Sequence, residues 1–169
     1  MTAGVVVRRA AAADAAGLVE LARAVGEEPE GWLISNGEWR TVSEERRYLR
    51  AVRKHTHAAV FVAEGEAGLV GRLSLSRDPH PASEHVADLG LMVAKEFRRQ
   101  GIGRALMEEA ERWAREVGVR KLELHVFPHN EAAIALYEAL GYEREGFRRG
   151  HYRRGSEYVD TVLMAKALA

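Results

Sequence analysis

Residues 88–106 constrain the fold of this chain more than any other segment. They read DLGLMVAKEFRRQGIGRAL: a short apolar run at 89–93, a charged bend, and a helix that opens around Gly101 and Gly103. Glycines remove Cβ atoms where the backbone turns, so several N–H groups can converge on one point. A helix N-terminus adds unpaired donors and a partial positive charge. The segment therefore predicts a strand, an anion-binding turn and a helix, in that order.

The charges around this turn indicate which kind of anion it binds. Arg98, Arg99 and Arg104 place three positive charges beside the glycines, which favours a phosphate or pyrophosphate. A P-loop is excluded because Gly103 is followed by Arg104 and Ala105 instead of a Lys-Ser/Thr pair. The dinucleotide fingerprint is excluded because Leu106 stands where a third small residue is needed.

A second segment, residues 122–142, repeats the order of strand, turn and helix. Residues 122–126 alternate as a strand does, and Asn130 is a suitable cap for the helix that follows. Gly141 is a suitable stop for that helix. Its apolar face comprises Ala133, Ile134, Leu136, Tyr137 and Leu140.

Together the two segments resemble the GNAT superfamily of acyl-CoA-dependent N-acyltransferases. Arg98, Gly101 and Gly103 meet its pattern of Gln or Arg, two residues, Gly, one residue, and Gly or Ala. Asn130 and Tyr137 meet its second pattern, Asn-x-x-Ala-x-x-Leu-Tyr with a Leu-Gly-Tyr exit. The resemblance extends from about residue 58 to the end of the sequence. Within the superfamily, the sequence most resembles a subgroup that includes L-amino-acid N-acyltransferases.

The resemblance implies an α/β (α+β) fold: a central mixed, largely antiparallel sheet of six or seven strands flanked by about four helices. The residues themselves indicate strands at 58–64, 69–76 and 89–93 that pair antiparallel, and a parallel crossover through the Gly101 helix to the strand at 122–126. The resemblance also implies acetyl-CoA as cosubstrate and no metal. The residues that match its cofactor-binding positions are Met92, Val93, Arg98, Arg99, Gln100, Gly101, Ile102, Gly103, Arg104, Asn130, Ala133 and Tyr137.

Two catalytic residues are predicted by the same resemblance. Tyr137 is the candidate general acid for the departing thiolate, since a phenol with a pKa of about 10 is protonated when a thiolate of about 8.5 forms. Asp88 is the candidate general base, with Glu123 and His125 on the neighbouring strand as alternatives. The structural alternatives are a tyrosine packed on the apolar helix face and a carboxylate that only stabilises a strand edge.

Composition limits the class of protein. The 169 residues suffice for one domain, taken here as residues 1–169. The 25 basic and 25 acidic residues cancel, so no global charge favours nucleic acid or a membrane surface. Cysteine is absent from the sequence, which excludes a disulfide and a cysteinyl acyl-enzyme. The start of the chain lacks a secretory signal pattern, so a cytoplasmic location is expected.

The remaining segments complete the expected order of elements. Strands are predicted at 5–9, 143–149 and 157–166, and helices at 10–25 and 41–54. The charges of the second helix, from Glu44 to Arg53, are interpreted as a solvated face. Phe147 to Arg154 is a basic aromatic cluster, interpreted as a hairpin that contacts the acceptor or a partner subunit and not nucleic acid.

Residues 26–40 form a loop that contains Trp32, Asn36, Gly37 and Trp39. In the GNAT superfamily this region shapes the acceptor pocket. The alternative is that both indole rings pack beneath the loop as a satellite core. An amino-acid acceptor would also need an arginine for its carboxylate, and the sequence offers Arg72 and Arg77 without choosing between them.

Three functions follow. The leading one is an N-acetyltransferase that moves an acetyl group from acetyl-CoA directly to a primary amine, on an amino acid or another small molecule. The second is a protein N-terminal or lysine acetyltransferase, and the third a non-catalytic acyl-CoA-binding module. The resemblance also implies a homodimer paired through the C-terminal strands.

Overall fold

The structure of the chain, a computed structural model, describes residues 4–34 and 39–169. One seven-stranded sheet in the order β1-β2-β3-β4-β5-β7-β6 organises it. The strands are β1 (Val6–Arg9), β2 (Ala58–Gly65), β3 (Gly68–Arg77), β4 (Val86–Val93), β5 (Lys121–Val126), β6 (Glu143–Arg154) and β7 (Glu157–Ala167). The longer helices are α1 (Ala15–Gly26), α2 (Val42–Val52), α3 (Ile102–Glu116) and α4 (Glu131–Ala139). The predicted fold class is confirmed, because β4 and β5 pair parallel and the other neighbouring strands pair antiparallel.

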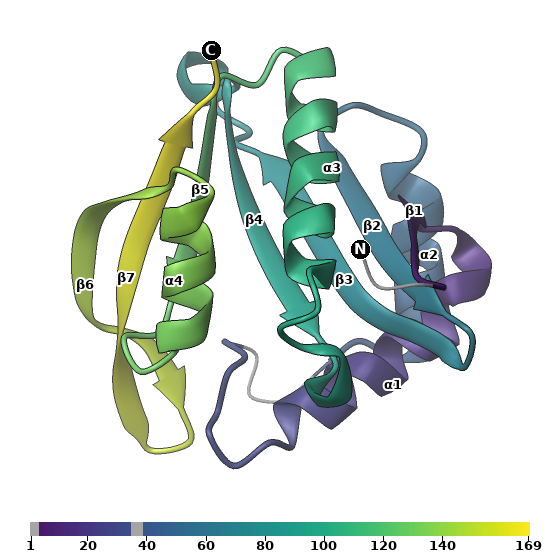
Figure 1. Cartoon of the computed structure of the whole chain (residues 1–169). Helices are drawn as coiled ribbons and strands as arrows, with labels where there is room; N and C mark the ends of the chain where they lie inside the picture. The colour runs from purple at the N-terminus through teal and green to yellow at the C-terminus, as the bar shows by residue number, and fades with distance from the viewer. Residues whose placement is uncertain (1–3, 35–38) are drawn as a thin grey trace.

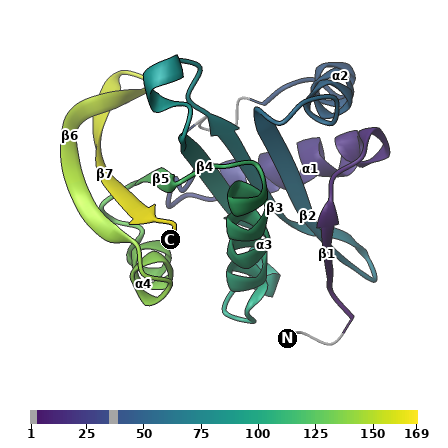
Figure 2. The same cartoon turned by 90° about the horizontal axis from the view of Figure 1, so that it is seen from above.

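The helices cover the sheet in two layers. α3 and α4 lie on one face, and α1 and α2 lie on the other, as the view from above shows (Figures 1 and 2). Because successive residues of a strand point to opposite faces, both faces of the sheet can bury apolar side chains beneath helices. Of the helices in the described part of the chain, none is long and apolar enough to cross a membrane.

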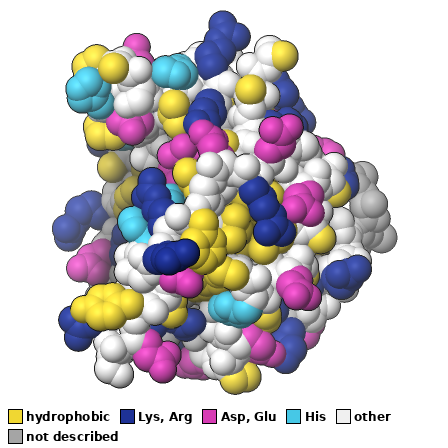
Figure 3. Space-filling view, turned by 90° about the vertical axis from the view of Figure 1, so that its left-hand side faces the viewer, with side chains coloured by type: hydrophobic (Ala, Val, Ile, Leu, Met, Phe, Trp, Pro, Cys, Tyr) yellow, Lys and Arg dark blue, Asp and Glu magenta, His cyan; other side chains and the backbone are white. Residues whose placement is uncertain are grey.

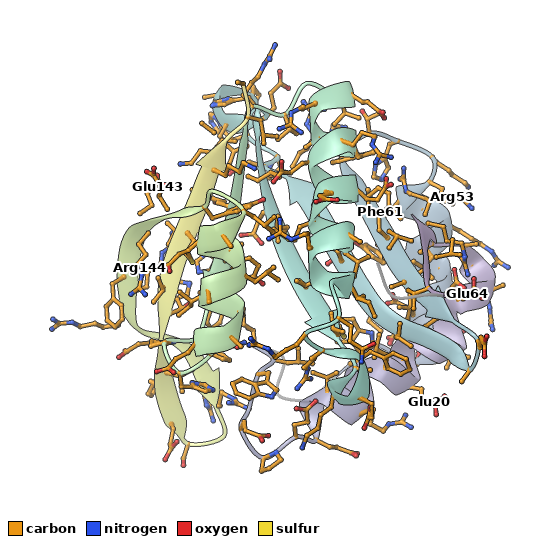
Figure 4. All side chains as sticks on the ribbon, in the orientation of Figure 1. Glu20, Arg53, Phe61, Glu64, Glu143 and Arg144 are labelled. Atoms are coloured by element: carbon orange, nitrogen blue, oxygen red, sulfur yellow. The ribbon has the colours of Figure 1, made fainter. Side chains whose placement is uncertain are left out.

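The larger core lies beneath α3. On the sheet-facing side of α3, Leu106 and Ala110 are fully buried. They belong to one cluster with Leu73 of β3 and Leu122 of β5. Phe61, labelled on β2 in Figure 4, belongs to the same cluster. At the other side of the molecule the labelled Glu143 and Arg144 at the start of β6 lie exposed (Figure 4). Apolar residues one helical turn apart on α3 thus hold this helix on the sheet.

The second core lies between the sheet and α2. α2 begins at a capping box in which the Thr41 hydroxyl accepts a bond from the Glu44 backbone N–H, and the Glu44 carboxylate accepts one from the Thr41 N–H. Leu49 of this helix packs with Leu18 of α1 and Val60 of β2. The predicted helix at 41–54 is confirmed as α2, Val42–Val52.

One part of that prediction is wrong. Glu45 does not belong to a solvated face, because its side chain is 0 % exposed. Its carboxylate lies 2.9 Å from Arg40 and 3.4 Å from Arg72, a β3 residue that is also buried. The charge can be buried because two guanidinium groups compensate it.

The pairing of β4 with β5 ends before β4 does. It runs from Val86 opposite Lys121 to Leu89 opposite Leu124, and the two strands then part. On its other side β4 stays paired with β3 as far as Val93 opposite Gly71. The open interval of β4, residues 90–93, therefore lies at the boundary between the two halves of the sheet (Figure 1).

Substitution of Gly71 tests the packing of α3 on β3. A Cβ atom at Gly71 would lie 2.9 Å from Leu106 Cδ1 and 3.3 Å from Ala63 Cβ. We expect Gly71→Ala to lower the free energy of unfolding by about 1–2 kcal/mol, because an extra methyl overpacks this contact.

The matched control is Gly90→Ala in the neighbouring strand, where the new Cβ would meet only Ser74 Oγ, at 3.9 Å. Urea unfolding of the two variants should show a loss for Gly71→Ala alone. Equal stability of the two variants would contradict the close approach of α3 to β3.

Candidate functional site

A cavity of about 540 Å³ lies where β4 and β5 part. Four segments line it: the end of β4, the turn that enters α3, one face of α4, and the loop that follows α1. The residues that line it are Val25, Trp32, Leu33, Leu91, Met92, Val93, Phe97, Arg98, Arg99, Gly101, Gly103, Arg104, Asn130, Ala132, Ala133, Ala135, Leu136 and Tyr137.

The turn into α3 has the conformation that its glycines permit. Gly101 is the N-cap of the helix and has φ of 84°, a left-handed conformation that side chains rarely adopt. A Cβ atom at Gly103 would lie 3.0 Å from Leu136 Cδ2 on α4, so the missing side chain lets the two helices approach. The turn therefore brings the first N–H groups of α3 to the cavity.

The same turn carries exposed positive charge. Arg99 and Arg104 are exposed and line the cavity on either side of the glycines. Arg99 also has a positive φ of 61°, which is uncommon for a residue with a side chain. Helix N–H donors and two free-standing guanidinium side chains make this end of the cavity suited to a pyrophosphate.

Tyr137 is held by α4 inside the cavity wall. Asn130 caps this helix, and its side-chain oxygen accepts a bond from the Ala133 N–H. The cap fixes the start of α4, and Tyr137 lies two turns further along the helix. The residue is 6 % exposed, and burial raises the pKa of its phenol above the ordinary value of 10. The phenol is thus protonated throughout the neutral pH range and can act as a proton donor.

Asp88 lies elsewhere. It stands four residues before Met92 on β4, roughly 13 Å along a strand, and does not line the cavity. Its carboxylate lies 3.9 Å from His125 Nε2 on β5. Burial and the neighbouring Glu123 raise the pKa of Asp88 to about 6. Its side chain is 55 % exposed, so water screens part of this effect.

His125 belongs to a group of rings on this face of the sheet. It stacks on His151 with centroids 5.7 Å apart and meets the edge of Tyr152 at 5.9 Å, both from β6. Burial and the nearby Arg148 and His151 lower the pKa of His125 below its ordinary value. The imidazole is therefore neutral at pH 7 and can accept a proton.

The loop after α1 closes the cavity on this side. Trp32 and Leu33 line it directly. Both also pack with Trp39, Val25 of α1 and Met92 of β4 in a third apolar cluster. Both rings pack in this cluster, as the satellite-core alternative predicted, and Trp32 also lines the cavity, whereas Trp39 is not among its lining residues. Asn36 and Gly37, which the sequence places in this loop, lie outside the described residues.

Several predicted residues stand apart from the cavity. Ile102 is buried in the core beneath α3, and the Gln100 amide donates to the Glu96 carbonyl at 3.0 Å. Of the arginines considered for an acceptor carboxylate, Arg72 is buried against Glu45 and Ser74. Arg77 donates to the Glu84 carbonyl. The other predicted cofactor-binding residues line the cavity together.

Sequence reasoning missed three residues that hold the loop. Glu28 accepts two bonds from Arg98, His129 Nε2 lies 2.9 Å from the Glu30 carbonyl oxygen, and Arg154 donates to the Gly31 carbonyl at 3.0 Å. Each contact joins residues that are 70 or more positions apart in the sequence. The only local signal was the cluster of charges and rings at 127–129 and 147–154.

Comparisons with known proteins agree with this arrangement. A model described as "Acetyltransferase (GNAT) family" matches residues 23–142. L-amino acid N-acetyltransferase AaaT of Escherichia coli K12 is 36 % identical over 110 residues, 63 % of this chain and 66 % of that protein. The ribosomal protein bS18-alanine N-acetyltransferase of the same strain is 40 % identical over 75 residues, 44 % of this chain and 51 % of that protein. The matches thus span just under two thirds and about half of these relatives.

Solved structures are similar over nearly the whole chain. A GNAT-family acetyltransferase of Streptococcus pneumoniae has a TM-score of 0.88 at 27 % identity, covering 97 % of this chain and 99 % of that one. An acetyltransferase of Salmonella typhimurium, solved with its cofactor acetyl-CoA, has a TM-score of 0.87 at 18 % identity, covering 99 % and 95 %. The second likeness shows the fold alone.

Neutralising one arginine tests the anion-binding end of the cavity. We expect Arg104→Gln to raise the dissociation constant of CoA on the order of tenfold, the factor that 1.4 kcal/mol corresponds to. Arg112→Gln, on the exposed side of the same helix, serves as the control for a lost charge. Isothermal titration at low and high salt should show a smaller salt dependence for Arg104→Gln, since one phosphate contact is lost. Equal affinities of the two variants would contradict the assignment.

Proposed function

Because this chain belongs to the Acetyltransferase (GNAT) family, we propose that it is an N-acetyltransferase that moves an acetyl group from acetyl-CoA directly to a primary amine of an amino acid or another small molecule. One observation carries the proposal: a single cavity joins the open end of β4, the basic glycine turn and the Tyr137 phenol. These are the groups that a thioester donor needs around it. Acetyl-CoA supplies the activated acetyl group and the thiolate leaving group.

The chain's own residues position the donor in two ways. The exposed Arg99 and Arg104, with the N–H groups at the start of α3, bind the pyrophosphate. The backbone of β4 beyond Leu89, which β5 leaves open, offers strand-like hydrogen bonds to the amide arm of the cofactor, although the Val93 carbonyl already accepts a bond from Arg98 Nε. A backbone N–H near Met92 can also donate to the oxygen that becomes negative during transfer.

Tyr137 donates the proton that the thiolate takes as it leaves. Its burial in the cavity wall keeps the phenol protonated until the thiolate forms, because the raised pKa disfavours the phenolate. We take acyl transfer to be direct, and the absence of cysteine from the sequence excludes a cysteinyl acyl-enzyme.

The base that accepts the amine proton is drawn from Asp88 and His125. They face each other at 3.9 Å, and Asp88 is too far along β4 from Met92 to reach the reacting amine without a water molecule between them. His125 is neutral at pH 7, as a base must be. We assign proton acceptance to this pair, with Asp88 as the residue that orients the imidazole.

The acceptor enters beside Trp32 and Leu33, which line the cavity. An α-amino group suits this site, because its ordinary pKa of 7.7–8.0 leaves a useful fraction neutral at pH 7, whereas a lysine amine near 10.4 is almost fully charged. An α-amino group is what both curated relatives acetylate by their names, one on L-amino acids and one on a ribosomal protein alanine. The second is therefore the alternative acceptor: the N-terminus of a protein.

Pairing of two chains is proposed at the C-terminal hairpin. Phe147 of β6 and Tyr158 of β7 are 54 % and 71 % exposed. On the side of the molecule that carries β6, hydrophobic side chains gather into a patch bordered by Lys and Arg (Figure 3). Homodimer formation and a cytoplasmic location remain predictions from the sequence.

The phenol is tested by Tyr137→Phe. We expect the turnover number to fall by about 10²- to 10⁴-fold, the usual contribution of a general acid, while the affinity for acetyl-CoA changes little because the ring stays in place. Release of free CoA thiol measures turnover with all L-amino acids, spermidine and the peptide Ala-Ala-Ala as acceptors. Tyr158→Phe, at an exposed position, is the control. Full activity of Tyr137→Phe would remove the proposed acid, and turnover with Ala-Ala-Ala alone would favour the protein acceptor.

The base is tested by the pH dependence of kcat/KM. A base works only when it is unprotonated, so activity is lost as the pH falls through its pKa. We expect an acid limb below pH 6.5, because burial and the nearby Arg148 and His151 lower the pKa of His125, the accepting base of the pair, from that ordinary value. The acceptor amine adds a limb near pH 8 that every variant shares.

His125→Gln should abolish the acid limb and lower kcat, whereas Asp88→Asn should shift the limb and keep part of the activity. A limb unchanged in both variants would show that the base lies elsewhere.

A further inference from the structure

We propose that the ion pair between Arg98 and Glu28 is a positioning element that ties the pyrophosphate turn to the acceptor loop, so that Arg98 supports acceptor binding and not acetyl-CoA binding. The inference rests on the proposed function and assigns a role to two residues that touch neither reacting group. It also separates Arg98 from the other two arginines of the turn.

All three nitrogens of the Arg98 side chain donate hydrogen bonds to protein groups other than the glycine turn. Its Nη1 and Nη2 donate to the two oxygens of Glu28 at 2.7 and 2.5 Å, and its Nε donates to the Val93 carbonyl at 2.9 Å. This bidentate pair and the bond to Val93 together use three of the five guanidinium N–H groups. Arg99 and Arg104, in contrast, are exposed beside the glycines.

Releasing Arg98 toward a pyrophosphate would leave Glu28 poorly compensated. The Glu28 side chain is only 9 % exposed. Burial by itself would raise the pKa of this carboxyl, yet hydrogen bonds from Arg98 and Trp32 hold it below its ordinary value. A buried carboxylate that loses its partner is strongly destabilising, so the pair stays together when the cofactor binds.

Glu28 also holds a residue of the cavity wall, Trp32. The same oxygen that accepts from Arg98 Nη1 also accepts from Trp32 Nε1, at 2.8 Å. The Trp32 ring then stacks on His129, with centroids 5.4 Å apart and planes 21° apart. Both the angle and the position of Trp32, which lines the cavity, therefore depend on the Glu28 carboxylate.

The other end of the ion pair is anchored at the transfer site. Val93 is the last residue of β4 and follows Met92, which packs in one cluster with Trp32, Leu33 and Trp39. By holding the Val93 carbonyl and Glu28 at once, Arg98 fixes the distance between the strand that would hold the thioester and the loop that faces the acceptor. That distance decides which amine reaches the acetyl group.

Two neutral variants and their combination test the proposal. Glu28→Gln and Arg98→Gln should each raise the KM of the acceptor on the order of tenfold, with the dissociation constant of acetyl-CoA within about twofold of wild type. The double variant should be no worse than either single one, since both remove the same interaction. Glu27→Gln, an exposed neighbour of equal charge, should behave as wild type.

The measurements are acetyl-CoA affinity by isothermal titration and initial rates with the best L-amino acid of the acceptor panel. Both KM and the dissociation constant are independent of the fraction of folded chains, so a loss of stability does not imitate the result. If Arg98 binds the pyrophosphate instead, Arg98→Gln weakens acetyl-CoA about tenfold while Glu28→Gln leaves it unchanged or tighter. That pattern, or an acceptor KM that neither variant changes, overturns the inference.

The proposed function itself is tested on the wild-type chain alone. Absence of acetyl-CoA binding to the wild-type chain would reject the transferase before any variant is compared. With acetyl-CoA bound but no acceptor used, the affinities of Arg98→Gln and Glu28→Gln still decide whether Arg98 is a phosphate ligand.

Discussion

The parting of β4 from β5 is the constraint on which the rest of this structure depends. The parallel pairing stops at Leu89 and Leu124, so the last residues of β4 keep one hydrogen-bonding edge without a strand beside it. Buried backbone groups need partners, and an extended cofactor arm can provide them. α3 and α4 line the same opening, and the absence of a side chain at Gly103 lets them meet at Leu136. The cavity thus arises where β4 and β5 part, and α3 and α4 complete its wall.

Charge in this protein is organised locally. The chain as a whole is neutral, with 25 basic and 25 acidic residues, yet exposed arginines gather at the turn into α3. In the interior, by contrast, acids and bases are buried together, as with Glu45 between Arg40 and Arg72. An anion therefore meets a positive end of the cavity without a general attraction of anions to the surface. The apolar remainder of the cavity wall excludes water from the place of transfer.

The loop after α1 is connected to three other parts of the molecule. It is tied to the β4–α3 turn by Glu28, to the β5–α4 turn by His129, and to the β6–β7 hairpin by Arg154. A loop held at three points can present Trp32 and Leu33 in a defined position, although loops are ordinarily the most variable part of a fold. Acceptor choice then depends on contacts outside the two motifs that identify the family.

The sequence by itself determined the local elements and the chemistry of the turn. Period and caps placed α2 at Thr41, α3 at the paired glycines and α4 at Asn130, because these features act within a few residues. Tertiary structure alone decided which charges are buried and what they hold. Glu45 looked like part of a solvated face and Arg98 like a phosphate ligand, but Glu45 is buried against Arg72 and Arg98 is paired with Glu28, 70 residues away. The free energy of a charged side chain depends on the solvent and the partner groups that surround it in the fold. The residues next to it in the sequence determine neither of these.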